Sequence, residues 1–410
     1  MQTVALGALI TELTGQARWA GIVAAAGFLP LGLLGPVGGA LADRLDRRRF
    51  LLSTISLQAV FAVALAVLVA TDHASPWPLT VLVFFGDGIG GIGFPAYQAL
   101  MPDLVPPEDL AGAVSLSAAQ WNLGRVLGPA AAGLAIGWGG YSLAFILNAA
   151  SFGVMAVALL ALQLREHVRA SGPLAIGQRM RAGWNAAIAE PGCRLAIQSI
   201  AVVSILPAPF IALIPAVARK VHGGDETLIS ALVTAQGVGA VAAAFSQTSL
   251  AARFGRPNVL IGSALGVGPA LVAYGIAPSP AAAVIALALV GFFYLAVFAG
   301  LNTVVQLRAA PEFRARVLSI YMVTLGILYP LAAIAQGALA DRIGLREVTA
   351  GSGIVFLAAV VAVVSRRHDL ATVLGDNTTP QGASLDRKPT LAQQPPSGST
   401  ALEAEQVVDT

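Results

Sequence analysis

The sequence predicts an all-α protein that crosses a membrane many times. Hydrophobic residues make up 57% of its 410 positions and charged residues 11%, whereas ordinary soluble domains have roughly 45–50% and 25%. The hydrophobic residues form runs close to the ~20 residues that a helix needs to cross the hydrocarbon core. Most arginines lie in short stretches between these runs, so the basic character does not indicate binding to nucleic acid.

Eleven complete spans follow from these runs. Residues 1–13 are also apolar, but they are too short to span, and they lack the basic start and the cleavage site of a signal peptide. We expect them to be the end of one further span, shortened by truncation or by a misassigned start codon. The predicted complete spans are residues 19–42, 50–70, 78–100, 113–137, 141–164, 194–218, 228–250, 258–277, 280–306, 317–340 and 347–365.

The basic residues predict the orientation of the spans. Eighteen of the 24 Lys and Arg residues fall in connections on one side of this topology, five fall on the other side, and Arg125 lies within a span. Because basic loops are retained in the cytoplasm, the side with eighteen is predicted to be cytoplasmic. We therefore expect a protein of the cell's inner (plasma) membrane with its C-terminus in the cytoplasm.

The chain is predicted to consist of two helical halves, residues 1–164 and residues 194–365. Between them, residues 165–193 form a polar cytoplasmic loop with an expected short amphipathic helix at Ile176–Ile188. Residues 366–410 are rich in Pro, Gly, Ser, Thr and Gln. That composition cannot bury enough apolar surface to fold, so we expect a disordered cytoplasmic tail.

A weak internal repeat agrees with two related halves. The stretch from Arg44 to Arg47 corresponds to the stretch from Arg253 to Arg256, and both fall between equivalent spans. Few residues are identical, so the repeat is inferred from the equivalent positions of the matching stretches in the two halves.

One loop resembles that of a known family. Gly39-Ala-Leu-Ala-Asp43-Arg44-Leu-Asp46-Arg47-Arg48, between two spans, is similar to the signature loop of the major facilitator superfamily, which usually has Gly at the place of Asp46. Phe94-Pro-Ala-Tyr-Gln98 and Leu147-Asn-Ala-Ala-Ser-Phe152 resemble stretches of the bacterial macrolide and siderophore exporters in that superfamily. The resemblance implies the major facilitator fold, with two six-helix halves that rock about a central site and, here, an incomplete first span.

The resemblance also implies a conformational latch at the cytoplasmic end. The carboxylate of Asp43 would accept hydrogen bonds from the free amides at the start of the span near Arg314 and Arg316, and a nearby arginine would strengthen that contact. The alternative is a solvated loop that only sets the orientation. The residues assigned to this latch are Gly39, Asp43, Arg44, Arg47, Arg48, Arg314 and Arg316.

A second motif is Gly124-Arg125-Val-Leu-Gly128-Pro129-Ala-Ala-Ala-Gly133, in the fifth span when the incomplete one is counted. Small residues four apart let helices approach closely, and Pro129 removes a backbone donor. The motif resembles the Gly-Pro element of the drug–proton antiporters of the superfamily, in which paired glycines often stand where this chain has Gly133 alone. Plain helix packing is the alternative explanation.

Two charged residues, Asp87 and Arg125, are predicted to lie near the middle of the bilayer in consecutive spans. Charges at that depth pair with each other or face a polar cavity. We expect an ion pair that borders the central cavity, with Asp87 as the proton-coupling carboxylate, and a static structural pair is the alternative. Other polar residues within spans are candidates for the cavity wall or for contacts between helices. They are Gln120, Asn122, Asn148, Gln236, Asn302 and Gln306, with Gln58 and Gln336 as further members.

The predicted function is secondary export of a small amphiphilic compound, drug- or siderophore-like, by alternating access and driven by proton antiport. The chain has no Gly-x-x-x-x-Gly-Lys-Ser/Thr motif for ATP, and its single Cys193 and scattered histidines predict no metal site, cofactor or enzyme activity. The expected partners are the substrate, the proton and the lipid bilayer, and a monomer is expected. Proton-coupled uptake of a small metabolite and a non-transporting membrane remnant or scaffold stay open as alternatives.

Overall fold

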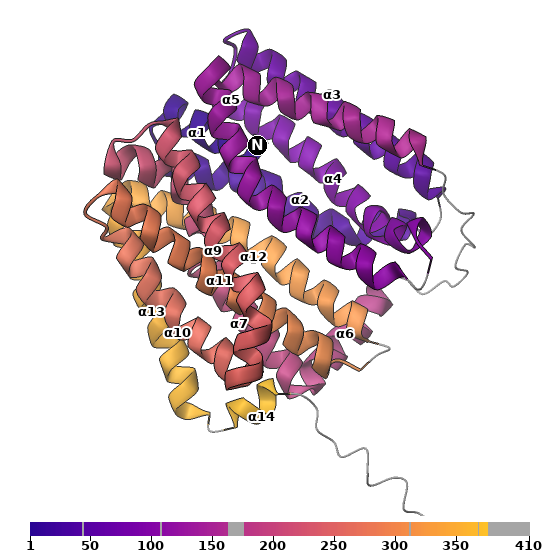
Figure 1. Cartoon of the computed structure of the whole chain (residues 1–410), viewed down its shortest axis with the longest axis vertical. Coiled ribbons are helices and arrows are strands. Elements are labelled where there is room, and N and C mark those ends of the chain that lie inside the picture. Colours follow the sequence, from indigo (N-terminus) through magenta and orange to yellow (C-terminus); the bar gives the residue numbers. More distant parts are fainter. Residues whose placement is uncertain (43–44, 107–108, 163–175, 311–312, 368, 376–410) are drawn as a thin grey trace, which may run out of the picture. The chain divides into compact units, whose positions relative to one another are not determined.

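The computed structural model describes residues 1–42, 45–106, 109–162, 176–310, 313–367 and 369–375, and some side chains inside helices also lie outside this description. These residues form helices without strands (Figure 1). The elements are α1 (Gln2–Thr14), α2 (Ala17–Ala42), α3 (Arg47–Ala70), α4 (Pro76–Leu104), α5 (Leu110–Ala161), α6 (Ile176–Ala189), α7 (Pro191–Ile205), α8 (Phe210–Ala216), the π-helix η2 (Val217–Val221), α9 (Glu226–Phe254), α10 (Arg256–Gly275), α11 (Pro280–Arg308), α12 (Arg314–Ile343), α13 (Leu345–Arg366) and α14 (Leu370–Leu374).

Ten segments of the described residues are long and apolar enough to cross a membrane. The sequence predicts eleven, and the difference lies in α5, which holds two predicted spans in one continuous helix assignment. Its backbone leaves helical geometry at Gly139 and at Gly140, where φ is 67°. That left-handed value favours glycine, and the position agrees with the turn expected between the two spans.

Side-chain caps begin several helices at the ends of the apolar runs. Asp46, which stands where the superfamily usually has Gly, is the N-cap of α3 and accepts a hydrogen bond from the Arg49 N–H at 2.8 Å. Asp225 caps α9 in the same way through the N–H groups of Thr227 and Leu228, at 3.0 and 3.2 Å. Each such cap satisfies free amides and stabilises its helix by about 1 kcal/mol.

The span predicted at residues 194–218 is broken in its middle. Pro207 and Pro209 interrupt it, so α7 ends at Ile205 and α8 begins at Phe210. A break inside a span frees backbone groups that need partners, because the hydrocarbon core offers none. Gln336 of α12 supplies them: its Nε2 donates to the carbonyl oxygens of Ile205 and Leu206 at 2.8 and 2.9 Å.

The two halves pack against each other along α2 and α12, with their backbones in direct contact at several glycines. A Cβ added to Gly32 of α2 would lie 3.0–3.3 Å from the backbone of Gly326 of α12, and a Cβ on Gly21 would overlap the Ala333 carbonyl. On the other helix, a Cβ on Gly337 would lie 2.8 Å from the Ala17 carbonyl oxygen. Small residues thus let two spans from different halves pack closely over much of their length.

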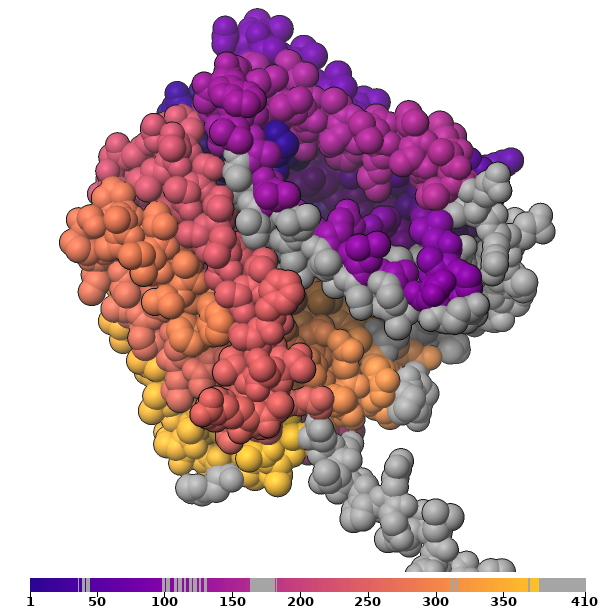
Figure 2. All heavy atoms as spheres, viewed as in Figure 1, coloured from indigo at the N-terminus to yellow at the C-terminus, as the bar shows by residue number. Residues whose placement is uncertain are grey.

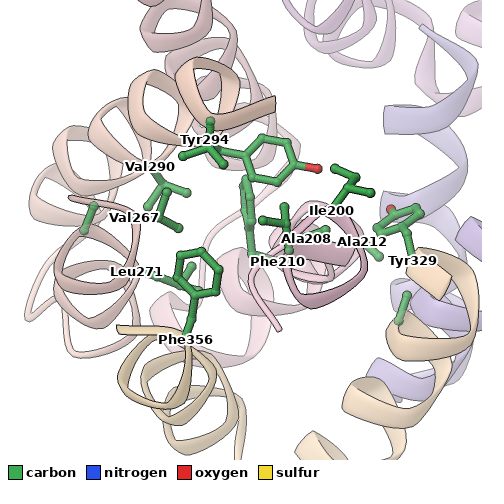
Figure 3. Close-up of a cluster of buried hydrophobic side chains, with 14 of the residues drawn as sticks. Ile200, Ala208, Phe210, Ala212, Val267, Leu271, Val290, Tyr294, Tyr329 and Phe356 are labelled. Atoms are coloured by element: carbon green, nitrogen blue, oxygen red, sulfur yellow. The ribbon is translucent and has the colours of Figure 1, made fainter. Parts of the chain in front are cut away.

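The C-terminal half has a continuous apolar core around the broken span (Figure 3). Phe210 of α8 packs edge-on against Tyr294 of α11, with ring centroids 5.6 Å apart and an interplanar angle of 83°. Leu271 of α10 and Phe356 of α13 are buried in the same cluster. This core fixes α8 against α10, α11 and α13, so the irregular segment has a defined position.

The first part of the predicted tail contains a short helix. Residues 366–410 were assigned to it, but residues Leu370–Leu374 form α14, and Leu370, Val373 and Leu374 are buried. Three apolar side chains at helical spacing pack this short segment against the bundle, although the average composition of the tail is polar. The rest of the predicted tail, residues 376–410, lies outside the described residues.

Candidate functional site

The interior of the N-terminal half is polar around Asp87 of α4. Asp87 lines a cavity of about 10 Å³ together with Gln2 of α1 and Gln58 of α3, a size that holds about one water molecule. Gly27 of α2 leaves room for the carboxylate, because a Cβ there would lie 3.0 Å from Asp87 Oδ2. Figure 2 shows a hollow in the surface of this half among the elements coloured indigo to magenta.

Asn148, one of the predicted polar residues, holds α1 in this interior. Its Nδ2 donates to Gln2 Oε1 at 2.6 Å. Gln2 was not a predicted site residue, because a single glutamine before an apolar run carries no signal by itself. Its place next to Asp87 and Asn148 follows only from the packing of α1 against α5.

The predicted ion pair between Asp87 and Arg125 stays a prediction. The side chain of Arg125 lies outside the described residues. No described side chain forms an ion pair or a hydrogen bond with Asp87. The structure therefore leaves the carboxylate available to Arg125, to a proton or to water.

The C-terminal half contributes a separate cavity of about 380 Å³ between α9, α11 and α12. This volume lies within the range of small-molecule clefts. The predicted Asn302 lines it, and Gln306 Nε2 donates to Asn302 Oδ1 at 2.5 Å. Gln236, a third candidate, is buried where α9 packs against Gly291 of α11 and does not line this cavity. The other lining residues are Ala243, Ala244, Gln247, Leu295, Phe298, Ala299, Thr303 and Met322.

The Gly-Pro element is described only in part. A Cβ on Gly124 would meet nothing within 4 Å, and one on Gly128 would lie 3.6 Å from the Met1 amine. A Cβ on Gly133 would overlap Ser230 of α9, so Gly133 allows close packing between the halves. The side chains of Pro129 and of Asn122 lie outside the described residues, and Gln120 is exposed.

The predicted outer end of the bundle is bridged by a polar cluster of Glu12, Tyr141, Arg219 and Glu226, called here the Arg219 cluster. Arg219 Nη2 donates to Glu12 Oε2 at 2.9 Å and to the Tyr141 hydroxyl at 2.8 Å, and it pairs with the Glu226 carboxylate. Glu12 and Tyr141 belong to the N-terminal half, and Arg219 and Glu226 to the C-terminal half. The cluster therefore bridges the two halves.

A second bridge at the same end joins Asp341 of α12 to the start of α2. Asp341 Oδ1 accepts from the Ala17 N–H at 2.8 Å, and Oδ2 accepts from the Arg18 N–H at 2.9 Å. Lys220 Nζ lies 3.3 Å from Oδ1. We call the contacts of Asp341 with Ala17 and Arg18 the outer latch. A carboxylate on the free amides of a helix start is favoured by hydrogen bonding and by the helix dipole.

The sequence contains a signal for the outer latch. Gly39-Ala-Leu-Ala-Asp43-Arg44 at the end of α2 recurs without change as Gly337-Ala-Leu-Ala-Asp341-Arg342 at the end of α12. The repeat that relates Arg44–Arg47 to Arg253–Arg256 differs from this one, because it links equivalent spans of the two halves. The hexapeptide repeat relates the ends of two helices that pack together.

The predicted cytoplasmic latch is not tested by this geometry. Asp43 and Arg44 lie outside the described residues, and Gly39 is described only as part of α2. Arg47 and Arg48 begin α3, where Arg48 donates to the Leu160 carbonyl oxygen of α5. Arg314 begins α12 and is exposed, and the Arg316 guanidinium lies 5.5 Å from the Phe313 ring.

Comparison with known proteins decides the family. The family described as "Transmembrane secretion effector" within the major facilitator superfamily matches residues 1–390. The chain belongs to the major facilitator superfamily. It is accordingly a multi-pass membrane transporter and not an enzyme.

Relatives of this superfamily chain include efflux proteins. The multidrug efflux pump Tap of Mycolicibacterium fortuitum is 26% identical over 383 residues, which cover 90% of this chain and 93% of that protein. Macrolide efflux protein A of Streptococcus pyogenes is 28% identical over 125 residues, 30% of this chain and 31% of that protein.

Solved structures of the superfamily share the fold. A point mutant of the nucleoside transporter NupG gives a TM-score of 0.68 at 13% identity, covering 88% of this chain and 94% of NupG. A bacterial homologue of the human lysosomal transporter Spinster, inward-facing and unoccupied, gives 0.67 at 17% identity, covering 91% and 92%.

Proposed function

We propose that this chain exports small amphiphilic compounds, drug- or siderophore-like, by alternating access in exchange for protons. It works as a monomer in the plasma membrane, because one chain supplies both halves, and its C-terminus lies in the cytoplasm. The similarity to Tap over nearly the whole of both chains supports export.

The observation that carries the alternating-access proposal is the position of the bridges between the halves. The Arg219 cluster and the outer latch both lie at the predicted outer end. A carrier bridged at its outer end presents its central site to the cytoplasm, where an exporter takes up its substrate. To release the substrate outside, both bridges have to open.

Asp87 supports the coupling to protons. It is a carboxylate deep within a span, it borders a cavity of about one water, and no described side chain pairs with it. Carboxylates in such positions in transporters mark ion and proton pathways. The cavity near Asn302 is the candidate site for the amphiphile, because its wall combines apolar side chains with the amides of Asn302 and Gln247.

The test is efflux of ethidium from cells that lack their main pumps and express the full chain. We expect uncoupler-sensitive efflux, lost in Asp87→Asn and kept in Asp109→Asn, which changes an exposed carboxylate at the start of α5. Membrane abundance is measured for each variant. Uncoupler-sensitive accumulation instead of efflux would favour uptake, and equal ethidium levels with and without the protein would count against this export proposal.

A further inference from the structure

The C-terminal half contains another cavity, which has no part in the proposed transport path and shares no lining residue with the cavity near Asn302. It occupies about 200 Å³ between α7, α10, α11, α13 and α14. Its walls are almost entirely apolar, and Val202 and Val363, which border it, are 37% and 41% exposed. Val202 lies well inside its span and Val363 near the end of α13, and exposed apolar side chains within spans face lipid, so the cavity opens toward the bilayer.

Three polar side chains interrupt the apolar wall, and all lie toward the predicted cytoplasmic end. They are Gln198 and Ser199 of α7 and Arg367, which follows α13. Among the described residues, none of the three side chains has a hydrogen-bond or ion-pair partner. Gln198 and Ser199 lie within a span, where polar groups need partners, and Arg367 lies just beyond the end of α13. Together the three point to a ligand whose polar part lies at the cytoplasmic end of the cavity.

α14 forms one wall of the cavity and is hydrogen-bonded to α11. Leu370 and Leu374 of α14 line the cavity. Arg308 Nη1 of α11 donates to the Thr372 carbonyl oxygen of α14 at 3.4 Å. Arg308 itself is paired with Glu190 at 2.8 Å. The pairing neutralises Arg308, and Arg367 is the charged residue among the described residues that line the cavity.

The order of these groups matches a phospholipid of the cytoplasmic leaflet. Arg367 lies at the helix end, Gln198 lies about 10 Å along α7 from its first residue, and the apolar lining continues to Val203 and Phe356. The volume is below the ~300 Å³ at which clefts for drug-sized ligands begin. It therefore suits one slender chain better than a bulky compound.

We propose that this cavity binds an acyl chain of an anionic phospholipid, with the phosphate on Arg367 and the ester region on Gln198 and Ser199. The single unpaired cation among the described lining residues favours a head group of net negative charge. The lipid joins α7 to α13 and α14 and holds the C-terminal half together at its cytoplasmic end. This inference depends on the membrane location and not on the direction of transport.

Native mass spectrometry of the purified full chain, titrated with phosphatidylglycerol or phosphatidylcholine of equal chain length, tests the proposal. We expect phosphatidylglycerol to bind about fivefold tighter or more. Arg367→Gln should remove this preference, and Arg366→Gln should keep it within about twofold, because Arg366 is exposed and does not line the cavity. Ala359→Phe, which fills the cavity, should weaken both lipids.

Thermal unfolding in detergent without lipid checks that each variant is folded. If Ala359→Phe does not fold, the comparison of the two arginine variants still decides. Equal binding of the two lipids by the unmodified chain would overturn the proposal. So would equal losses in Arg367→Gln and Arg366→Gln, which would indicate attraction by general surface charge.

Discussion

Removing the Asp341 side chain should open the outer end of the transporter. Asp341→Ala deletes two hydrogen bonds from a carboxylate to backbone N–H groups, at 2.8 and 2.9 Å. Loss of a capping carboxylate costs about 0.5–2 kcal/mol, and the half-exposed ion pair with Lys220 adds little. A shift of about 2 kcal/mol changes the ratio of closed to open outer ends about 30-fold.

Distances between spin labels measure this ratio. Leu13 of α1 and Ile343 of α12 are 44% and 54% exposed, lie in different halves at the predicted outer end, and accept labels after Cys193→Ala. We expect Asp341→Ala to move the distribution to longer distances. Asp341→Asn should give a smaller shift, because its amide keeps one acceptor.

The matched control is Asp72→Asn, which changes an exposed carboxylate in the connection between α3 and α4 and leaves every described bridge intact. It should leave the distances unchanged. If Asp341→Ala gives the distribution of the unmodified protein, the outer latch does not hold the halves together and the reasoning is refuted.

Further predictions concern packing, the broken span and pH. Gly32→Ala should lower the Tm of the purified protein, because its Cβ crowds Gly326 at a cost of about 1–3 kcal/mol. Gly35→Ala should leave the Tm unchanged, because no atom lies within 4 Å of its added Cβ. Equal Tm values for the two variants would contradict the close packing. Gln336→Leu leaves the carbonyls of Ile205 and Leu206 without their donor and should cost about 1–3 kcal/mol, and an unchanged unfolding midpoint would show that the break does not need it. Burial, with a smaller effect of the Arg346 charge, lowers the pKa of His222. Because the folded state favours the neutral imidazole, the stability of the protein should fall as the pH drops below about 6.5. In thermal unfolding, His222→Gln should reduce that fall, and the control His73→Gln should not.

The positions of most spans could be predicted because apolar runs and capping residues act locally. The predicted span 228–250 lies within α9, which extends a few residues beyond it at both ends, and the predicted span 280–306 begins with α11, which ends two residues later. The break at Pro207 and Pro209 could not be predicted from hydropathy, because prolines in an apolar run barely change it. The break is tolerated because Gln336 donates hydrogen bonds to the carbonyls that it frees. Gln336 lies 130 residues away from Leu206 in the sequence.

The candidate site was predictable only where one residue is unusual by itself. Asp87 stood out because an acidic residue in the middle of a span is rare. The Arg219 cluster was not predicted, because its members come from four different elements and each is an ordinary charged or polar residue at a helix end. Asp341 was predictable in principle, from the repeated Gly-Ala-Leu-Ala-Asp-Arg.

Proton movement in proteoliposomes tests the central claim most directly. The purified chain is reconstituted with a pH-sensitive dye inside the vesicles, and ethidium is added outside under an imposed pH gradient. The account predicts proton flux that starts with ethidium addition, moves opposite to ethidium, and disappears in Asp87→Asn but not in Asp109→Asn. Ethidium transport without proton flux, or proton flux unchanged in Asp87→Asn, would contradict it.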